Sequence, residues 1–285
     1  MRTVICAIAK NENDYINEWI DYHLSLGFDR IYLYDNNDST TPFVGDFIKQ
    51  RSKVNILAVN DVHTEKLQIK CYDSFYEKYK DTFDWCAFID IDEFIVLPGV
   101  NNIKKVLQKD IFTKFNAVRL NWHIYDDNNL VVRDKKVPVM KAFTNRVNIP
   151  ELDQSKMILR GNLANIQIVS CHYALQNNNL VKECLLDGQE TFDKIFSKDH
   201  CDLGYINHYM TKTVDEFIDQ KLFRGDACFS LRKLDFEYFW KINQKTDEKL
   251  NYIQTKLSKI IKYYSPAIKK VDNVGDIFTF LIAGE

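Results

Sequence analysis

Strands and helices alternate along the first hundred residues, and this alternation restricts the fold more than any other feature of the sequence. Apolar runs rich in β-branched residues predict four strands, at residues 3–9, 30–34, 54–59 and 85–89. Helical spacing of apolar residues predicts helices at 16–24 and 66–79, and Thr41 with Pro42 predicts the start of a short third one. Strands and helices in this order form a parallel sheet covered by helices on both faces. The sequence therefore predicts an α/β fold.

The pattern changes beyond residue 100, where the periodicity weakens. We expect a helix at 103–109 and a strand at 117–122, followed by short strands. Thr213 and Glu216 form a capping-box pattern that opens a helix reaching residue 222. The tail after residue 235 is helical in pattern and rich in lysine. We therefore expect a main domain over residues 1–234 and a helical extension over residues 235–285.

The composition excludes several classes of protein. Lys and Arg number 38 against 40 Asp and Glu, so the chain lacks the positive charge with which most nucleic-acid-binding proteins attract phosphate. Only 9 Gly are present, and no glycine-rich loop of the P-loop or dinucleotide-binding type occurs. We expect no nucleic-acid partner, and we expect any nucleotide to be bound without such a loop.

The seven cysteines do not suggest a disulfide framework or a zinc site, because their number is odd and no C-x-x-C pair occurs. Cys6 and Cys86 lie in apolar runs, where a free thiol packs as a small hydrophobic group. The first residues have too short an apolar run for a signal peptide, and no run approaches the ~18 apolar residues of a membrane span. These features predict a cytoplasmic location.

Polar side chains follow three of the four predicted strands. In an open α/β sheet, ligands bind at the carboxyl ends of the strands, so these residues are the first candidates for a site. They are Lys10, Asn11 and Glu12 after the first strand, Asp35 and Asn36 after the second, and Asp90 and Asp92 after the fourth. The sequence predicts a polar site at this edge of the sheet.

Asp90 and Asp92 have the clearest chemistry of this set. A D-x-D triplet is weak by itself, because a chain with this much aspartate contains such triplets by chance. These two residues, however, stand between two apolar runs, where carboxylates lose hydration unless a cation or hydrogen-bond donors compensate them. Mg²⁺ or Mn²⁺ held by one or two carboxylates keeps positions open for phosphate oxygens, so the pair predicts a diphosphate ligand. The alternative is that the carboxylates cap local backbone N–H groups.

Four longer motifs are spread over residues 3–226. They are I-C-A-I-A-K-N-E-N-D-Y near the N-terminus, D-W-C-A-F-I-D-I-D-E-F around Asp90, N-W-H-I-Y-D-D-N from residue 121 and N-H-Y-M-T-K-T-V-D-E-F-I-D-Q-K-L-F-R-G from residue 207. Together they resemble glycosyltransferase family 92 and the related bacterial, family-2-like enzymes with a GT-A fold. Eukaryotic members carry Phe-Gly where this chain has Tyr125 and Asp126, so their acceptor preference does not transfer.

The resemblance implies a Rossmann-like GT-A fold with a mainly parallel central sheet flanked by helices. It implies a nucleotide-sugar half over about residues 1–100 and an acceptor half over about residues 101–234. The reaction would move a sugar, with galactose from UDP-galactose as first choice, to a hydroxyl of a glycan or glycolipid in surface polysaccharide assembly, with inversion at the anomeric carbon. Asp90, Asp92 and His208 would hold Mn²⁺ or Mg²⁺ against the leaving diphosphate. His172 has a weaker claim as a ligand.

The residues for the nucleotide-sugar donor come from the strand ends and from the resemblance. The set is Ala9, Lys10, Asn11, Glu12, Asp35, Gln68, Lys70, Ile91, Lys221 and Arg224. Asp35 fits the acid that this fold places against the base or ribose, although an Asp in a D-N-N loop can also form the turn. Gln68 and Lys70 point either into the cleft or into solvent. Lys221 and Arg224 either pair with phosphate oxygens or only end a helix.

Inversion requires a general base within hydrogen-bond reach of the acceptor hydroxyl, and a carboxylate can serve. Asp127 is our first prediction, and Asp126, Glu151 and Asp153 remain open. Trp122 offers a flat apolar face to an acceptor sugar, although a tryptophan is more often part of the core.

Two other functions remain open. A nucleotidyltransferase would use similar carboxylates, but usually has a glycine-rich loop after the first strand. A non-catalytic module that binds a nucleotide sugar or a glycan could share the fold. The expected partners are a UDP-sugar and a glycan or lipid-linked glycan acceptor. The basic tail either forms a solvated helix face or touches anionic lipid at the inner face of the membrane.

Overall fold

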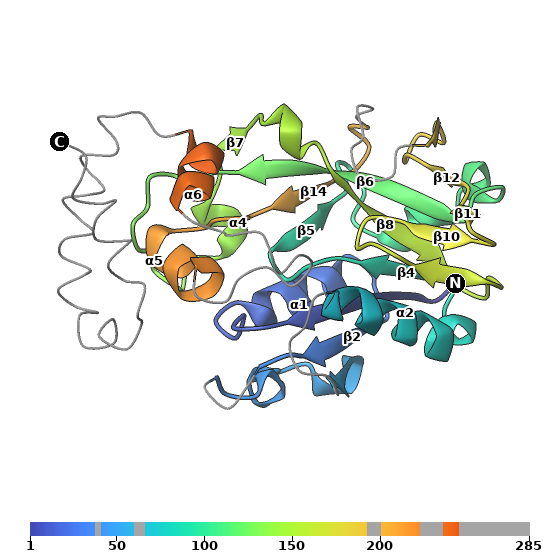
Figure 1. Cartoon of the computed structure of the whole chain (residues 1–285), viewed down its shortest axis with the longest axis horizontal. Coiled ribbons are helices and arrows are strands. Elements are labelled where there is room, and N and C mark those ends of the chain that lie inside the picture. Colours follow the sequence, from blue (N-terminus) through green and yellow to red (C-terminus); the bar gives the residue numbers. More distant parts are fainter. Residues whose placement is uncertain (38–40, 60–65, 193–200, 223–235, 245–285) are drawn as a thin grey trace.

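The computed structural model describes residues 1–37, 41–59, 66–192, 201–222 and 236–244 (Figure 1). The strands are β1 Thr3–Ala9, β2 Arg30–Asp35, β3 Val54–Ala58, β4 Trp85–Phe88, β5 Glu93–Val96, β6 Ala117–Tyr125, β7 Arg146–Val147, β8 Ser155–Arg160, β9 Ile166–Ile168, β10 Ala174–Gln176, β11 Asn179–Leu180, β12 Glu183–Cys184, β13 Glu190–Thr191 and β14 Tyr205–His208. The helices are α1 Ile16–Ser25, α2 Leu67–Tyr79, α3 Ile103–Leu107, α4 Val139–Ala142, α5 Val214–Phe217 and α6 Phe236–Asn243.

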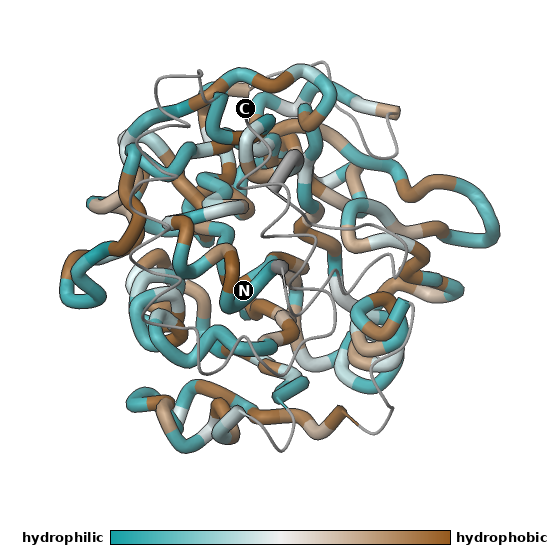
Figure 2. Tube along the Cα trace, turned by 60° about the vertical axis from the view of Figure 1, so that its left-hand side comes forward, coloured by the Kyte–Doolittle hydropathy of each residue, from teal (hydrophilic) through white to brown (hydrophobic). Residues whose placement is uncertain are grey.

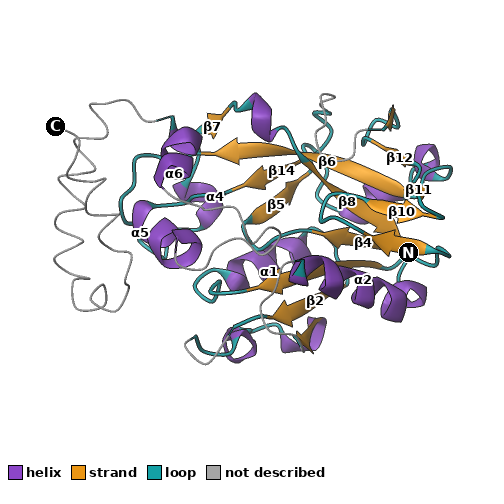
Figure 3. Cartoon of the chain, in the orientation of Figure 1, coloured by secondary structure: helices purple, strands orange, loops and turns teal. Residues whose placement is uncertain are grey.

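The central sheet has the strand order β13-β12-β6-β8-β4-β1-β2-β3. β1 runs parallel to both β2 and β4, and β2 runs parallel to β3. β8 lies antiparallel between β4 and β6. Further along β6, β14 pairs with it in parallel and with β5 in antiparallel fashion, and these strands run side by side in Figure 3. The predicted mixed α/β fold with a mainly parallel central sheet is confirmed.

Alternation along β1 shows how the two faces of the parallel half are covered. Ile5 and Ala7 pack in one core cluster with Ile16 and Trp19 of α1. Cys6 points to the opposite face, into a second cluster that includes buried residues of α2. Hydrophobic and hydrophilic stretches alternate along the trace, as expected for elements with one buried face (Figure 2). The predicted covering of both faces is confirmed.

Two predicted helices differ from the structure in detail. The short helix expected to begin at Thr41 and Pro42 is a 3₁₀ turn, η1 Val44–Phe47, which starts two residues later. Asp35 sets the start of this turn at Val44, because its carboxylate accepts the Val44 N–H at 2.7 Å. The helix expected over 213–222 consists of α5 followed by a π-helical turn, η6 Ile218–Leu222.

α6 is the described part of the expected C-terminal extension, and it packs on the main domain. The ring of Phe239 lies 5.0 Å from that of Phe217 in α5. α4, α5 and α6 gather at one end of the molecule (Figure 1). Residues 245–285, with most of the basic tail, lie outside the described residues. In the described part of the chain, no helix is both long and apolar enough to cross a membrane.

Candidate functional site

The turn after β4 and the end of β14 bring three predicted metal ligands to one region. Asp90 and Asp92 lie in the turn between β4 and β5. β14 pairs antiparallel with β5, and this register sets His208 directly opposite Glu93. The Tyr209 N–H then donates to the Asp92 carbonyl at 2.9 Å. Residues that are more than a hundred positions apart in sequence therefore meet at the carboxyl end of β4.

Asp92 is buried between a histidine and a lysine. Its Oδ1 lies 3.5 Å from His208 Nε2, and its Oδ2 accepts from Lys221 Nζ at 2.8 Å. Burial alone would raise the pKa of Asp92, but Lys221 and His208 hold that pKa well below its usual value. Burial lowers the pKa of His208, and Asp92 offsets this only in part. Asp92 is therefore charged and His208 neutral near pH 7.

Asp90 is more exposed than Asp92 and is held by two neighbours. Its Oδ2 lies 2.7 Å from Lys156 Nζ, and its Oδ1 accepts a hydrogen bond from Gln68 Nε2. The side chain of Asp90 is 30% exposed, whereas that of Lys156 is 1% exposed. Gln68 therefore points into the site, which is one of the two orientations predicted for it. Lys70 is exposed.

Glu93 lies completely buried beneath this turn. Its Oε2 accepts the backbone N–H of Asp90 at 2.9 Å. Its Oε1 lies 3.7 Å from Lys156 Nζ and 3.8 Å from His208 Nδ1. Burial raises the pKa of Glu93 well above its usual value, and Lys156 reverses only part of this effect. Glu93 and Lys156 therefore form a buried ion pair beneath the turn that carries Asp90 and Asp92.

Trp122 forms a wall beside the carboxylates. Its ring centroid lies 4.2 Å from that of His208 and 5.4 Å from that of His172. His172 is anchored through Nδ1, 2.9 Å from the Ser155 carbonyl oxygen. The Lys156 ammonium lies 5.8 Å from the centre of the Trp122 ring. The structure thus places predicted acceptor and metal residues against one another.

The other strand ends form a tightly bonded loop region. Asp35 is buried, with Oδ1 accepting the Asn37 N–H and Oδ2 that of Val44, so it makes the turn that was its alternative role. Asn11 has a positive φ of 57° and donates its N–H to Asn37 Oδ1. Ala9, Glu12, Asn36 and Ile91 are buried, and Lys10 is half-buried. Their roles in binding a nucleotide stay predictions, and Arg224 lies outside the described residues.

The candidates for the general base have different surroundings. Asp127 is completely buried, and its Oδ1 accepts the Asn129 N–H at 2.9 Å. Asp126 is half-buried and accepts the Asn128 N–H. Glu151 is exposed, and Asp153 is half-buried in the loop before β8. None of these contacts identifies the general base, so the roles of these four carboxylates stay predictions.

The chemistry of Asp90, Asp92 and His208 fits a hard or borderline divalent cation. Two carboxylates and one neutral imidazole are ligands that Mn²⁺ and Mg²⁺ accept. Among the described residues, no three His, Cys, Asp or Glu side chains are gathered as a metal site in this arrangement. Lys156 and Lys221 occupy the carboxylates instead, so a cation would bind by competing with these two ammonium groups.

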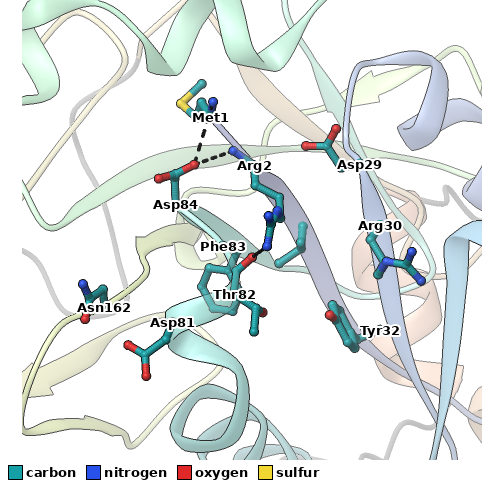
Figure 4. A pocket seen from close by; sticks show the side chains of 11 residues that line it. Met1, Arg2, Asp29, Arg30, Tyr32, Asp81, Thr82, Phe83, Asp84 and Asn162 are labelled. Atoms are coloured by element: carbon teal, nitrogen blue, oxygen red, sulfur yellow. Dashed lines mark hydrogen bonds and ion pairs between the residues drawn. The ribbon is translucent and has the colours of Figure 1, made fainter.

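A cavity of about 740 Å³ lies at the opposite edge of the sheet, by the amino ends of β1 and β2 (Figure 4). Its polar groups bind one another, since Asp84 accepts from the backbone N–H of Arg2 and Arg2 Nη1 donates to the Thr82 carbonyl. None of the predicted site residues lines this cavity. The predicted site therefore lies at the other end of the strands.

An α/β sheet with paired carboxylates and a histidine at its carboxyl edge agrees with the glycosyltransferase that the sequence motifs predict. The family model of glycosyltransferase family 92 matches residues 3–261, and the chain belongs to this family. The resemblance seen in the sequence motifs is thereby confirmed.

Curated relatives carry the same family name. A glycosyltransferase family 92 protein of Arabidopsis thaliana is 25% identical over 258 residues, which cover 86% of this chain and 40% of the relative. A family 92 protein of Oryza sativa subsp. japonica is 25% identical over 169 residues, covering 58% of this chain and 28% of the relative. The chain thus spans less than half the length of each.

A solved structure, TarS of S. aureus, shares 13% identity with this chain and gives a TM-score of 0.31. The match covers 44% of this chain and 22% of TarS. This likeness is too distant to say anything about function.

Sequence patterns missed Lys156 and Glu93. Glu93 stood in the D-x-D-E-F motif, but a single Glu gives no sign of burial. Lys156 did leave a signal, because it directly precedes the apolar residues M-I-L of β8 and, two residues before Ile158, lies on the same face of the strand as that core residue. A lysine on the inward face of a strand indicates a buried acidic partner.

Proposed function

We propose that this chain is a metal-dependent, inverting glycosyltransferase that moves a sugar from a UDP-sugar to a hydroxyl of a glycan or glycolipid. Galactose is the first choice, on the strength of the family resemblance, and surface polysaccharide assembly is the proposed setting. One observation carries the proposal: Asp90, Asp92 and His208 converge at the carboxyl end of β4 in a member of family 92. Ligands of open α/β sheets bind at this edge.

The residues divide the work on the leaving group. Asp90, Asp92 and His208 would hold Mn²⁺ or Mg²⁺, which when bound neutralises the charge that develops on the diphosphate. Lys221 lies 2.8 Å from Asp92, so its ammonium is available to a phosphate oxygen once a cation replaces it at the carboxylate. Glu93 fixes the turn from below through the Asp90 N–H. Such preorganised charge is usually the largest contribution to catalysis.

The transfer itself is a single displacement. The acceptor oxygen attacks the anomeric carbon, the bond from that carbon to the β-phosphate oxygen breaks, and the configuration inverts. A carboxylate takes the proton from the acceptor hydroxyl, and UDP leaves. Trp122 lies against His208 and so offers its ring to the sugar nearest the reaction.

Calorimetry of UDP binding tests the proposal directly. We expect the wild-type chain to bind UDP with Mn²⁺ present, and to release UDP from UDP-galactose. Asp92→Ala should weaken UDP binding at least tenfold, because it removes a ligand and leaves Lys221 without its partner. Asp21→Asn, which removes an exposed carboxylate on α1, is the matched control and should bind normally.

Other outcomes would assign other functions. If UDP does not bind in the presence of Mn²⁺, the proposal is wrong. Binding without turnover across a broad acceptor panel would favour the non-catalytic module. Release of galactose 1-phosphate instead of UDP from UDP-galactose would favour nucleotidyl transfer.

A further inference from the structure

Two lysines cover the predicted metal ligands, and the structure holds them differently. Lys156 is buried, and its Nζ contacts both Asp90 and Glu93. The side chain of Lys221 is 15% exposed, and its one ion pair with a described residue is to Asp92, at 2.8 Å. If Lys156 left, the buried Glu93 would lose its cation, whereas Lys221 can leave Asp92 without such a loss. Lys221 is therefore the ammonium that gives way when a divalent cation competes for these carboxylates.

The local helix geometry explains how Lys221 reaches Asp92. Lys221 lies in the π-helical turn η6, and the residue before it, Gln220, is buried. Asp219 of the same turn is exposed. A π-helical turn adds one residue to a helical turn, changes which side chains face inward, and occurs frequently at functional sites. This turn directs two consecutive side chains toward the interior of the molecule.

Gln220 is fixed by two donors from other parts of the chain. Its Oε1 accepts from the hydroxyl of Tyr15 at 2.7 Å and lies 3.5 Å from Nζ of Lys212, which also donates to Tyr15 Oη at 2.8 Å. We call these three side chains the Tyr15 network. It joins the first and the last of the four sequence motifs, because Tyr15 immediately precedes α1 and Lys212 lies between β14 and α5. The anchored Gln220 fixes the position of the next residue, Lys221.

Lys212 is an unusual residue for a position that only packs. It is 2% exposed, and its ammonium forms no ion pair with a described carboxylate. Tyr15 compensates this charge through its hydroxyl and through its ring, whose centre lies 4.4 Å from Nζ. The backbone of Lys212 has φ 54°, a left-handed conformation that costs energy in a residue other than glycine. Such strain persists where the surrounding structure uses the residue, so the ammonium of Lys212 has a role beyond packing.

We propose that the Tyr15 network holds Lys221 on Asp92, where its ammonium takes the place of a divalent cation until a diphosphate binds. This inference rests on the proposed function. Gln220 is then a positioning residue, and Lys221 is a built-in competitor for the metal site. Once a cation neutralises Asp92, the released ammonium of Lys221 pairs with a phosphate oxygen of UDP. Binding of the metal and binding of UDP are therefore coupled through Lys221.

Calorimetric titration with manganese chloride at neutral pH tests this competition without turnover. We expect Lys221→Met to bind Mn²⁺ at least ~fivefold more tightly than wild type in the absence of nucleotide, because no ammonium then competes for Asp92. Lys221→Arg retains a competing cation and should bind Mn²⁺ as weakly as wild type. Lys53→Met removes an exposed ammonium from the 3₁₀ turn η2 Arg51–Lys53 and is the matched control, which should also behave as wild type.

The same titrations with UDP present measure the coupling. UDP should tighten the binding of Mn²⁺ to wild type, and Lys221→Met should reduce this enhancement at least ~fivefold, the lower end of typical couplings between two sites. The effect of Mn²⁺ on UDP binding must fall by the same factor, because coupling is reciprocal. This closed cycle separates lost coupling from a simple loss of UDP affinity.

Gln220→Met tests the network itself. It removes the oxygen that accepts from Tyr15, at a similar side-chain size, so Lys221 should be released and Mn²⁺ should bind more tightly than to wild type. A merely structural role predicts the opposite, because a damaged site binds its cation more weakly. Gln220→Glu retains an oxygen acceptor and should restore wild-type affinity. If Gln220→Met does not fold, Lys221→Met still decides the question, because its side chain is partly exposed.

Two results would overturn the inference without touching the proposed function. Equal Mn²⁺ affinity of wild type and Lys221→Met in the absence of nucleotide would show that Lys221 does not compete at Asp92. Weaker Mn²⁺ binding by Gln220→Met would reduce the Tyr15 network to a structural role. Failure of wild type to bind Mn²⁺ together with UDP would instead reject the proposed function itself.

Discussion

A single buried lysine, Lys156, holds the turn that carries the predicted metal ligands. The side chain of Lys156 is 1% exposed, yet its Nζ forms ion pairs with Asp90 Oδ2 at 2.7 Å and with Glu93 Oε1 at 3.7 Å. A buried ammonium loses hydration, and two carboxylates around it compensate that loss. Lys156 therefore holds the turn after β4 in place.

Replacement of Lys156 by methionine should lower the free energy of unfolding by about 3–5 kcal/mol, because it leaves two carboxylates without their cation. Urea denaturation followed by circular dichroism measures this change. Glu93→Gln added to Lys156→Met should recover part of the loss, because one buried charge is then removed. A Lys156→Met chain as stable as wild type would show that the ion pairs contribute nothing.

At the scale of elements, the segment from β14 to the π-helical turn links the site to the far end of the molecule. It carries His208 at its start and Lys221 near its end. Between them, Thr213 opens α5 with a capping box whose other member is Glu216. Glu216 also lies 2.9 Å from a guanidinium nitrogen of Arg133, and both side chains are buried. The cap therefore fixes a segment with two predicted ligand-binding side chains.

Thr213→Ala should lower the free energy of unfolding by about 1 kcal/mol, because it removes the hydroxyl of the capping box, one of the two side-chain acceptors of the Glu216 N–H beside Asp215 Oδ1. Thr213→Ser keeps that acceptor and is the matched control. Thermal unfolding of both variants measures the difference. Equal stability of the alanine and serine variants would contradict the role of the cap.

At the scale of the whole molecule, a buried histidine makes stability depend on pH. His23 has Nδ1 2.8 Å from the Trp19 carbonyl oxygen, and its Nε2 accepts the Ile95 N–H at 3.3 Å. Burial lowers the pKa of His23 from 6.5 to about 3. Because the folded pKa lies below the unfolded one, the stabilisation is complete above pH 6.5 and is lost as the pH falls toward 3.

Between pH 7 and pH 5, His23 should therefore reduce the free energy of unfolding by about 2 kcal/mol. Urea denaturation at the two pH values measures the fall. In His23→Gln, which retains an amide oxygen as acceptor, this share of the pH dependence should disappear. An equal fall in the variant would mean that other groups cause it.

The parallel half of the sheet, the two helices that cover it and the capping box at Thr213 could all be predicted from the sequence. Period-two and period-3.6 patterns are local, and each segment reports its own buried face without reference to the rest of the chain. The polar strand ends around Asp90 followed from the same reasoning. The start of η1 could not, because the Asp35 carboxylate, nine residues earlier, sets it.

Local pattern alone thus determined an α/β chain with carboxylates at one edge of its sheet, and the motifs indicated the family. Only the tertiary structure decided which cations meet those carboxylates. Lys156 reaches Asp90 through the antiparallel insertion of β8, and Lys221 reaches Asp92 from a segment 129 residues away. Ion pairs inside a core depend on the distance between the two side chains in space, and the local sequence pattern does not contain that distance.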